Sequence, residues 1–204
     1  MECLGKNQQK SEILTMTNGS KTVFLDRDGV LIHDVHYLSD LKQIEFFSDV
    51  PDGLRKLKNK GYQLIMITNQ SGVARGYFDE SFVLESFQYI NRILKQADAE
   101  LDMMYFCPHH PDGYPPLNIV CDCRKPATGM IRKATKEFKV DNEKSYMIGD
   151  KYCDIELAAN AHIKGIHLAT GYGKEHSKKV MEKFPKTPYL NTFSEAVEYI
   201  LLSD

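Results

Sequence analysis

The chain has 204 residues, of which 42% are hydrophobic and 26% are charged, and its 26 basic and 28 acidic residues give a net charge of −2. This size and apolar content predict one compact globular domain and exclude fibrous and wholly disordered proteins, because enough apolar surface is present to offset the conformational entropy of folding. The balanced charge argues against nucleic acid or an anionic membrane as a partner. If the protein binds a phosphate, a local group of side chains must therefore bind it, because the overall charge does not attract it.

Residues 1–20 are polar and aperiodic, so we expect a flexible N-terminal extension there and a single domain over residues 21–204. The sequence has no secretory signal and no apolar segment of bilayer length, which predicts a cytoplasmic protein. The number of cysteines is odd, and three of the five lie close together beside histidines. This pattern favours a metal site over disulfide bonds.

Five short apolar runs without clean polar alternation are typical of parallel strands covered on both faces. They lie at residues 22–25, 63–68, 103–106, 146–148 and 165–168. Helical patterns lie at residues 51–59, 79–96, 128–138, 153–161 and 194–202. This alternation predicts an α/β fold, a three-layer Rossmann-like sandwich with a central, mostly parallel sheet.

In such sheets, ligands bind outside the carboxyl ends of the strands. Asp26 and Asp28 follow the first strand, and their i, i+2 spacing predicts that both carboxylates project to the same side while Arg27 points away from the cleft. If the strand before Asp150 lies beside the first strand, a third carboxylate joins them. Three acids of this kind suit Mg²⁺.

Neutral donors and cations follow other predicted strands. Residues 68–71 offer hydroxyl and amide groups to phosphoryl oxygens, and Arg124 and Lys125 supply positive charge from a later loop. Together with the carboxylates, these groups predict phosphoryl transfer.

At this point the sequence resembles a known family. Asp26-Arg27-Asp28-Gly29-Val30, Thr68-Asn69, Lys125 and Gly149-Asp150 resemble, in this order, the four motifs of the haloacid dehalogenase superfamily of phosphatases. The strings at residues 66–76, 107–111 and 121–126 narrow the resemblance to the D-glycero-D-manno-heptose 1,7-bisphosphate phosphatases. The resemblance covers about residues 21–175.

The resemblance implies a mechanism and its residues. Asp26 would be the nucleophile that forms an aspartyl-phosphate, and Asp28 would be the general acid and base. Thr68 and Lys125 would stabilise the transferred phosphoryl group, while Asp26, Asp150 and Asp28, the last through its backbone carbonyl, would bind Mg²⁺. The substrate-binding residues that the resemblance implies are Asp34, Val35, His36, Tyr37, Thr68, Asn69, Gln70, Ser71, Arg124, Lys125 and Lys151.

The cysteine loop resembles the zinc site of the same family, with Cys107, His109, Cys121 and Cys123 as ligands. Three thiolates and one imidazole suit tetrahedral Zn²⁺, and four protein ligands leave no open position. We therefore expect a structural zinc that holds a proline-rich loop beside the active site. His110 is the competing fourth ligand.

The substrate implied by the resemblance is a small sugar phosphate, heptose 1,7-bisphosphate, which loses its 7-phosphate in the biosynthesis of nucleotide-activated heptose for lipopolysaccharide and other surface polysaccharides. One alternative is a histidinol-phosphate phosphatase, although that neighbouring family usually has a loop shorter than residues 110–120. Another is a zinc-stabilised binding module without catalysis. The sequence does not determine the α or β anomer.

Three smaller expectations remain. No segment is long enough for a large cap domain, so we expect an open cleft, and the lack of exposed apolar heptads predicts a monomer. Asp154 fits a site residue and a carboxylate favoured at a helix start equally well. Cys153 is expected to serve packing rather than chemistry.

Overall fold

The structure is a computed structural model that describes residues 19–203, so most of the expected N-terminal extension, residues 1–18, lies outside the described residues. The elements of the described part are, in chain order, β1 (Thr22–Leu25), η1 (Leu41–Gln43), α1 (Val50–Asn59), β2 (Gln63–Asn69), α2 (Ser71–Ala74), α3 (Glu80–Lys95), β3 (Met103–Cys107), α4 (Gly129–Phe138), η2 (Asn142–Lys144), β4 (Tyr146–Gly149), α5 (Tyr152–Asn160), β5 (Lys164–Leu168), α6 (Gly173–Lys183), β6 (Tyr189–Leu190) and α7 (Phe193–Leu202).

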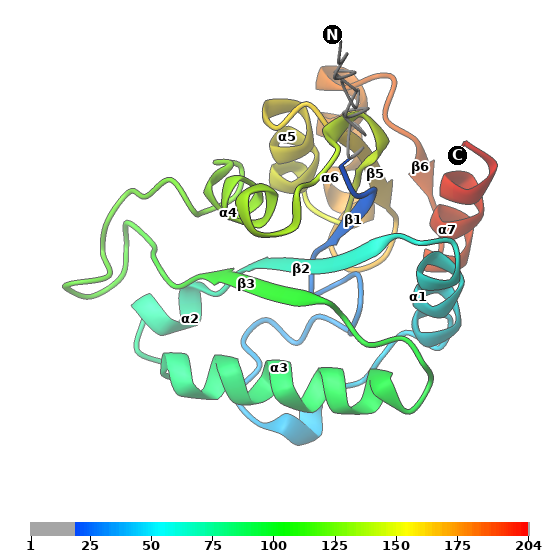
Figure 1. Ribbon diagram of the computed structural model, residues 1–204. Helices are drawn as coiled ribbons and strands as arrows, with labels where there is room; N and C mark the ends of the chain where they lie inside the picture. The colour runs from blue at the N-terminus through cyan, green and yellow to red at the C-terminus, as the bar shows by residue number, and fades with distance from the viewer. Residues whose placement is uncertain (1–18, 204) are drawn as a thin grey trace, which may run out of the picture.

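The strands form one parallel sheet in the order β3-β2-β1-β4-β5-β6, which confirms the predicted α/β architecture (Figure 1). β1 lies between β2 and β4, with Leu25 paired to Met66 and to Ile148. The carboxyl ends of these three strands therefore meet at one edge. The pairing of β1 with β4, which the third carboxylate required, is present.

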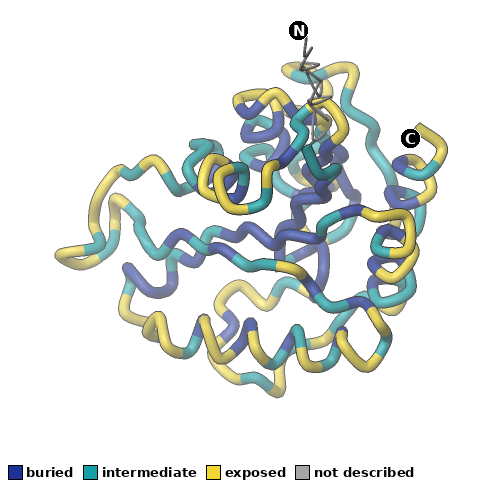
Figure 2. The backbone as a smooth tube through the Cα atoms, viewed as in Figure 1, coloured by how far each residue is buried: buried dark blue, intermediate teal, exposed yellow. Residues whose placement is uncertain are grey.

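Helices cover both faces of the sheet (Figure 1). Val23 and Leu25 of β1 pack in a cluster with buried residues of α1, α3 and α7, whereas Phe24 packs on the other face with buried residues of α4 and α5. This alternation follows from the period of two in a strand. The strands are consequently buried on both sides while the helices expose one face each (Figure 2).

Five elements were not predicted from the sequence: α2, α6, β6 and the two short 3-10 helices η1 and η2. α6 lacks a broad apolar stripe, since its buried residues are only Gly173 and Val180 and its other positions are mostly charged or polar. α2 has four residues and β6 has two, which is too short for a periodic pattern to emerge. The helices and strands that were predicted all occur, with ends that differ by one residue at most.

The segment between β3 and α4 contains no helix or strand and extends beyond the sheet edge as a long loop, in agreement with the prediction (Figure 1). Between residues 19 and 203 no helix combines the length and the apolar character that a membrane crossing requires.

Candidate active site

Three buried carboxylates lie together at the carboxyl edge of the sheet. Asp26 follows β1, Asp150 follows β4, and Asp154 belongs to the first turn of α5. Their ligand atoms lie within 4.8 Å of one another, and each residue is at most 4% exposed. Burial raises the pKa of Asp150 to about 8 and also raises that of Asp154. Three buried carboxylates this close together need positive charge nearby to compensate them.

Lys125 supplies the positive charge that is closest to these acids. Its Nζ lies 2.9 Å from Asp26 Oδ1 and 2.7 Å from Asp154 Oδ1, and it donates to the carbonyl of Ile67. Burial alone would raise the pKa of Asp26, but Lys125 and Lys151 outweigh it and hold the pKa below its usual value. Asp26 is therefore an ionised carboxylate at neutral pH.

Asn69 fixes the backbone that carries Lys125. Its side-chain carbonyl accepts the Lys125 N–H at 3.0 Å, and its amide donates to the Lys125 carbonyl at 3.1 Å. The sequence predicted Asn69 as a substrate-binding residue, and it does border the cavity described below. Both polar ends of its side chain are hydrogen-bonded to the backbone of Lys125.

Asp28 does not join the other carboxylates, contrary to the prediction from i, i+2 spacing. Arg27 donates to both of its oxygens, from Nε and from NH2 at 3.0 Å each, and Gln70 Nε2 donates to Oδ2 at 3.0 Å. β1 ends at Leu25, so strand alternation no longer applies at Asp28. Arg27, which we expected to point away from the cleft, is buried and does not line the cavity described below, and its guanidinium donates to Asp28, Gln70 and Ser86.

Gly29 permits the turn that follows. It has a φ of 84°, and a Cβ at this position would lie 2.3 Å from Asp150 Oδ2. The same carboxylate oxygen accepts the backbone N–H of Tyr172 at 2.8 Å. No described residue hydrogen-bonds the buried Asp150 Oδ1, so this oxygen is available to a cation.

A cavity of about 310 Å³ is lined by chain neighbours of this cluster, namely Lys151, Cys153 and Arg124. Most of the predicted substrate-binding residues border it, and the full set is Asp28, Asp34, His36, Tyr37, Asn69, Gln70, Ser71, Gly72, Arg124, Lys151, Cys153 and Tyr172. Lys151 pairs with Asp34 at 3.0 Å. Val35 lies in the same loop with 38% of its surface exposed, and Thr68 is buried and accepts a hydrogen bond from Gln70.

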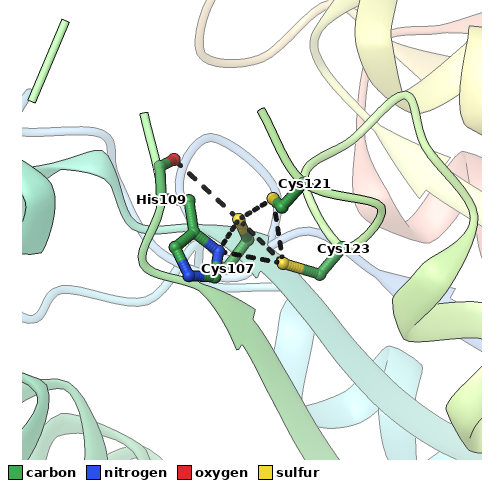
Figure 3. Close-up of side chains that lie close together, drawn as sticks. All are labelled: Cys107, His109, Cys121 and Cys123. Atoms are coloured by element: carbon green, nitrogen blue, oxygen red, sulfur yellow. Dashed lines mark hydrogen bonds between the residues drawn. The ribbon is translucent and has the colours of Figure 1, made fainter. Parts of the chain in front are cut away.

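Beside the cavity, Cys107, His109, Cys121 and Cys123 bring three sulfur atoms and one imidazole nitrogen within 4.8 Å of one another (Figure 3). The sulfur atoms are 3.1–3.5 Å apart, far beyond the length of a disulfide bond, and the thiols are free. His109 Nδ1 lies 3.3 Å from Cys123 Sγ. His110, the competing ligand, instead accepts the N–H of Asp112.

Four residues of the acid cluster and the cavity wall were not assigned to the site from the sequence: Gly72, Cys153, Asp154 and Tyr172. Asp154 was left undecided, and the structure places it against Lys125. Tyr172 was not considered, although it follows β5, a neighbour of β4, and so obeys the rule that ligands meet the carboxyl ends of strands. Extending that rule to the fifth strand could have found it.

Comparisons with known proteins agree with this site. A family model described as HAD-hydrolase-like matches residues 122–196. The D-glycero-beta-D-manno-heptose-1,7-bisphosphate 7-phosphatase of Haemophilus influenzae is 43% identical over 145 residues, which cover 71% of this chain and 79% of the relative. The corresponding alpha-anomer phosphatase of Photorhabdus laumondii is 40% identical over 157 residues, 76% of this chain and 86% of the relative.

Among solved structures, a D,D-heptose 1,7-bisphosphate phosphatase from B. bronchiseptica, complexed with magnesium and phosphate, superposes with a TM-score of 0.81. It is 27% identical and covers 90% of this chain and 99% of its own. With the acid cluster, the lysine and the cysteine loop arranged as described, these similarities show that the chain belongs to the D-glycero-D-manno-heptose 1,7-bisphosphate 7-phosphatase family of haloacid dehalogenase-like hydrolases.

Proposed function

We propose that this protein is a Mg²⁺-dependent phosphatase that hydrolyses the 7-phosphate of D-glycero-D-manno-heptose 1,7-bisphosphate, on the route to nucleotide-activated heptose. The observation that carries the proposal is an ionised carboxylate, Asp26, that is paired with the buried Lys125. It lies two residues before Asp28, which lines a cavity together with Arg124 and Lys151. A nucleophile close to Lys125, with Arg124 and Lys151 in the neighbouring cavity wall, suits a substrate that carries two phosphates.

The carboxylates fit a magnesium ion. Asp26 and Asp150 offer oxygen ligands of the type that Mg²⁺ prefers, and Asp150 Oδ1 has no partner among residues 19–203. Asp28 would contribute its backbone carbonyl, as the family resemblance implies. When bound, the ion neutralises acid charge and polarises phosphoryl oxygens.

Asp26 performs the first step. A carboxylate oxygen attacks phosphorus, an oxygen–phosphorus bond forms, and the bond between phosphorus and the sugar oxygen breaks. Lys125 lies beside Asp26, and Thr68 lies on the neighbouring strand β2. Both residues stabilise the phosphoryl group during transfer. The product is an aspartyl-phosphate and a free sugar hydroxyl.

Asp28 moves the protons in both steps. It gives a proton to the departing sugar oxygen and then takes one from the water that attacks the aspartyl-phosphate, which releases phosphate and restores Asp26. Arg27 and Gln70 hold both oxygens of Asp28 at hydrogen-bond distance. Their role is to orient this carboxyl group in the wall of the cavity.

We propose further that the sulfur and imidazole cluster binds a structural Zn²⁺ through Cys107, His109, Cys121 and Cys123. Burial raises the pKa of the Cys107 thiol, so a thiolate there needs a cation to stabilise it. Arg124 follows the last ligand and donates to the carbonyl of His109 at 3.3 Å. The zinc would thus fix a cation that contacts the phosphate not being cleaved.

Three free thiols in one cluster suit a reducing compartment such as the cytoplasm. Every residue proposed for the site comes from one chain, so a monomer would suffice for activity.

The test is phosphate release by the Mg²⁺-loaded protein from the α and β heptose bisphosphates and from histidinol phosphate. We expect one heptose bisphosphate to give the highest kcat/KM. Asp26→Asn should lower kcat by more than about 10⁴-fold. Asp98→Asn is the matched control, because Asp98 is exposed and has a left-handed φ of 52° that asparagine tolerates. Normal Mg²⁺-dependent turnover by Asp26→Asn would refute the proposed mechanism.

A further inference from the structure

Tyr172 borders the same cavity as Asp28 and Arg124, yet the mechanism above gives its side chain no role. It lies in the turn between β5 and α6, on a loop that faces the loop following β1. Thr170 ties the two loops together by donating to the carbonyl of Gly29 at 2.6 Å. Tyr172 therefore stands at a fixed place in the cavity wall.

The phenol of Tyr172 meets His36 across the gap between these loops. Its hydroxyl lies 2.7 Å from His36 Nδ1, and the Lys151 ammonium lies 4.9 Å from the centre of its ring. His36 has a φ of 66°, an unfavourable conformation for a residue with a Cβ, and its N–H donates to Asp34 Oδ1 at 2.7 Å. Strain of this kind concentrates at functional sites.

The side chain of Tyr172 is not needed to hold Asp150. The contact with Asp150 Oδ2 comes from the backbone N–H, which any residue except proline would supply. The hydroxyl instead points to His36, which is exposed and also borders the cavity. A tyrosine hydroxyl has one donor and two acceptor sites, so a single bond to His36 leaves capacity for a second partner.

We propose that the Tyr172 hydroxyl, which the resemblance does not include, joins His36 to form a specificity wall that binds hydroxyl groups of the sugar, beyond the phosphate under attack. This inference rests on the proposed function, because it assigns a contact to the polyhydroxylated part of the same substrate. The wall discriminates among phosphate esters by the hydroxyl groups that they carry, and it leaves the transfer chemistry at Asp26 unchanged.

The experiment compares two substrates and four proteins. Wild type, Tyr172→Phe, His36→Ala and the double variant are assayed on the preferred heptose bisphosphate and on p-nitrophenyl phosphate, which has no sugar hydroxyls. For Tyr172→Phe we expect KM for the sugar substrate to rise about tenfold with kcat within about twofold, and no change for p-nitrophenyl phosphate. The double variant should lose little more than either single variant. Tyr199→Phe, an exposed tyrosine on α7, is the control.

Equal losses on both substrates would overturn the inference, because they would mean that Tyr172 acts on the catalytic cluster. An unchanged KM for the sugar substrate would overturn it as well. Failure of the proposed function would be visible separately, as wild type that prefers another phosphosugar. Tyr172→Phe is then assayed on that phosphosugar with the same expected tenfold rise in KM.

Discussion

The buried ion network around Lys125 makes the most direct prediction about stability. Lys125→Met keeps the length and the apolar stem of the side chain but removes the ammonium, which lies 2.9 Å from Asp26 Oδ1 and 2.7 Å from Asp154 Oδ1. At these distances, an effective dielectric constant near 20 gives about 6 kcal/mol of attraction for each pair. Desolvation of the ammonium offsets most of this attraction, so the net effect is smaller.

Breaking a buried ion pair by removing one partner costs about 3–5 kcal/mol, because an uncompensated charge is left behind. Here both acids and the carbonyl of Ile67 lose a partner, so we expect a loss of about 4 kcal/mol in the free energy of unfolding at pH 8. That is a large share of the 5–15 kcal/mol typical of a whole domain.

The loss should depend on pH. In wild type the pKa of Asp26 is lowered, so its contribution to stability is present above about pH 4 and persists to pH 8. In Lys125→Met, burial is opposed only by Lys151 and the Arg27 N–H, so we expect the pKa of Asp26 to rise and its contribution to be lost as the pH rises through the raised value. The difference in unfolding free energy between wild type and Lys125→Met should therefore widen from pH 5 to pH 8.

Urea unfolding followed by circular dichroism, with one equivalent of Zn²⁺ and no Mg²⁺, measures this difference at each pH. Lys136→Met, which removes an exposed lysine from α4, should change stability by less than about 0.5 kcal/mol. A loss below about 1 kcal/mol at pH 8, or a difference that stays constant with pH, would refute the reasoning.

Three further predictions concern the two candidate metal sites. Mg²⁺ must displace the proton of Asp150, whose pKa is about 8. The affinity for Mg²⁺, measured by titration calorimetry, should therefore rise about tenfold per pH unit between about pH 6 and pH 7.5. An affinity that does not change with pH would contradict this. Gly29→Ala puts a Cβ 2.3 Å from Asp150 Oδ2 and should abolish the Mg²⁺-induced rise in Tm, whereas Gly61→Ala, at a φ of 79° with no atom within 4 Å, should cost only about 1 kcal/mol of stability. Cys121→Ser should lower the zinc content measured by mass spectrometry and speed proteolysis of residues 108–128; full zinc occupancy in that variant would exclude Cys121 as a ligand.

Local patterns predicted most of the fold because they depend on short-range chemistry. Apolar runs identified five strands, and the order of polar residues after them identified the edge where the acids meet. α6 escaped prediction since it packs with only Gly173 and Val180 buried, so its sequence does not differ from a solvated segment. When tertiary contacts bury only a few residues of a helix, its sequence shows no hydrophobic periodicity that could predict it.

The orientation of individual acids was harder to predict. The Asp28 carboxylate lies outside the acid cluster because the chain turns at Gly29 and the guanidinium of Arg27 donates to both oxygens of Asp28. Asp154 entered the cluster because the first turn of α5 faces Lys125, a contact between residues 29 positions apart in sequence. Spacing along a chain predicts direction only while the backbone stays regular.

The loop that carries Arg124 and Lys125 is held at two points. These two attachments determine whether loss of the sulfur cluster changes KM or kcat. Lys125 is clamped by the Asn69 side chain and by the buried acids, which do not involve the sulfur cluster. The Arg124 side chain makes one described hydrogen bond, to the backbone carbonyl of His109, which belongs to the cluster. Loss of the cluster in Cys121→Ser should therefore displace Arg124 more than Lys125. If Arg124 binds the distal phosphate and Lys125 stabilises the transferred group, KM for the bisphosphate should rise while kcat changes little, and the reverse pattern would show that the cluster supports Lys125 instead.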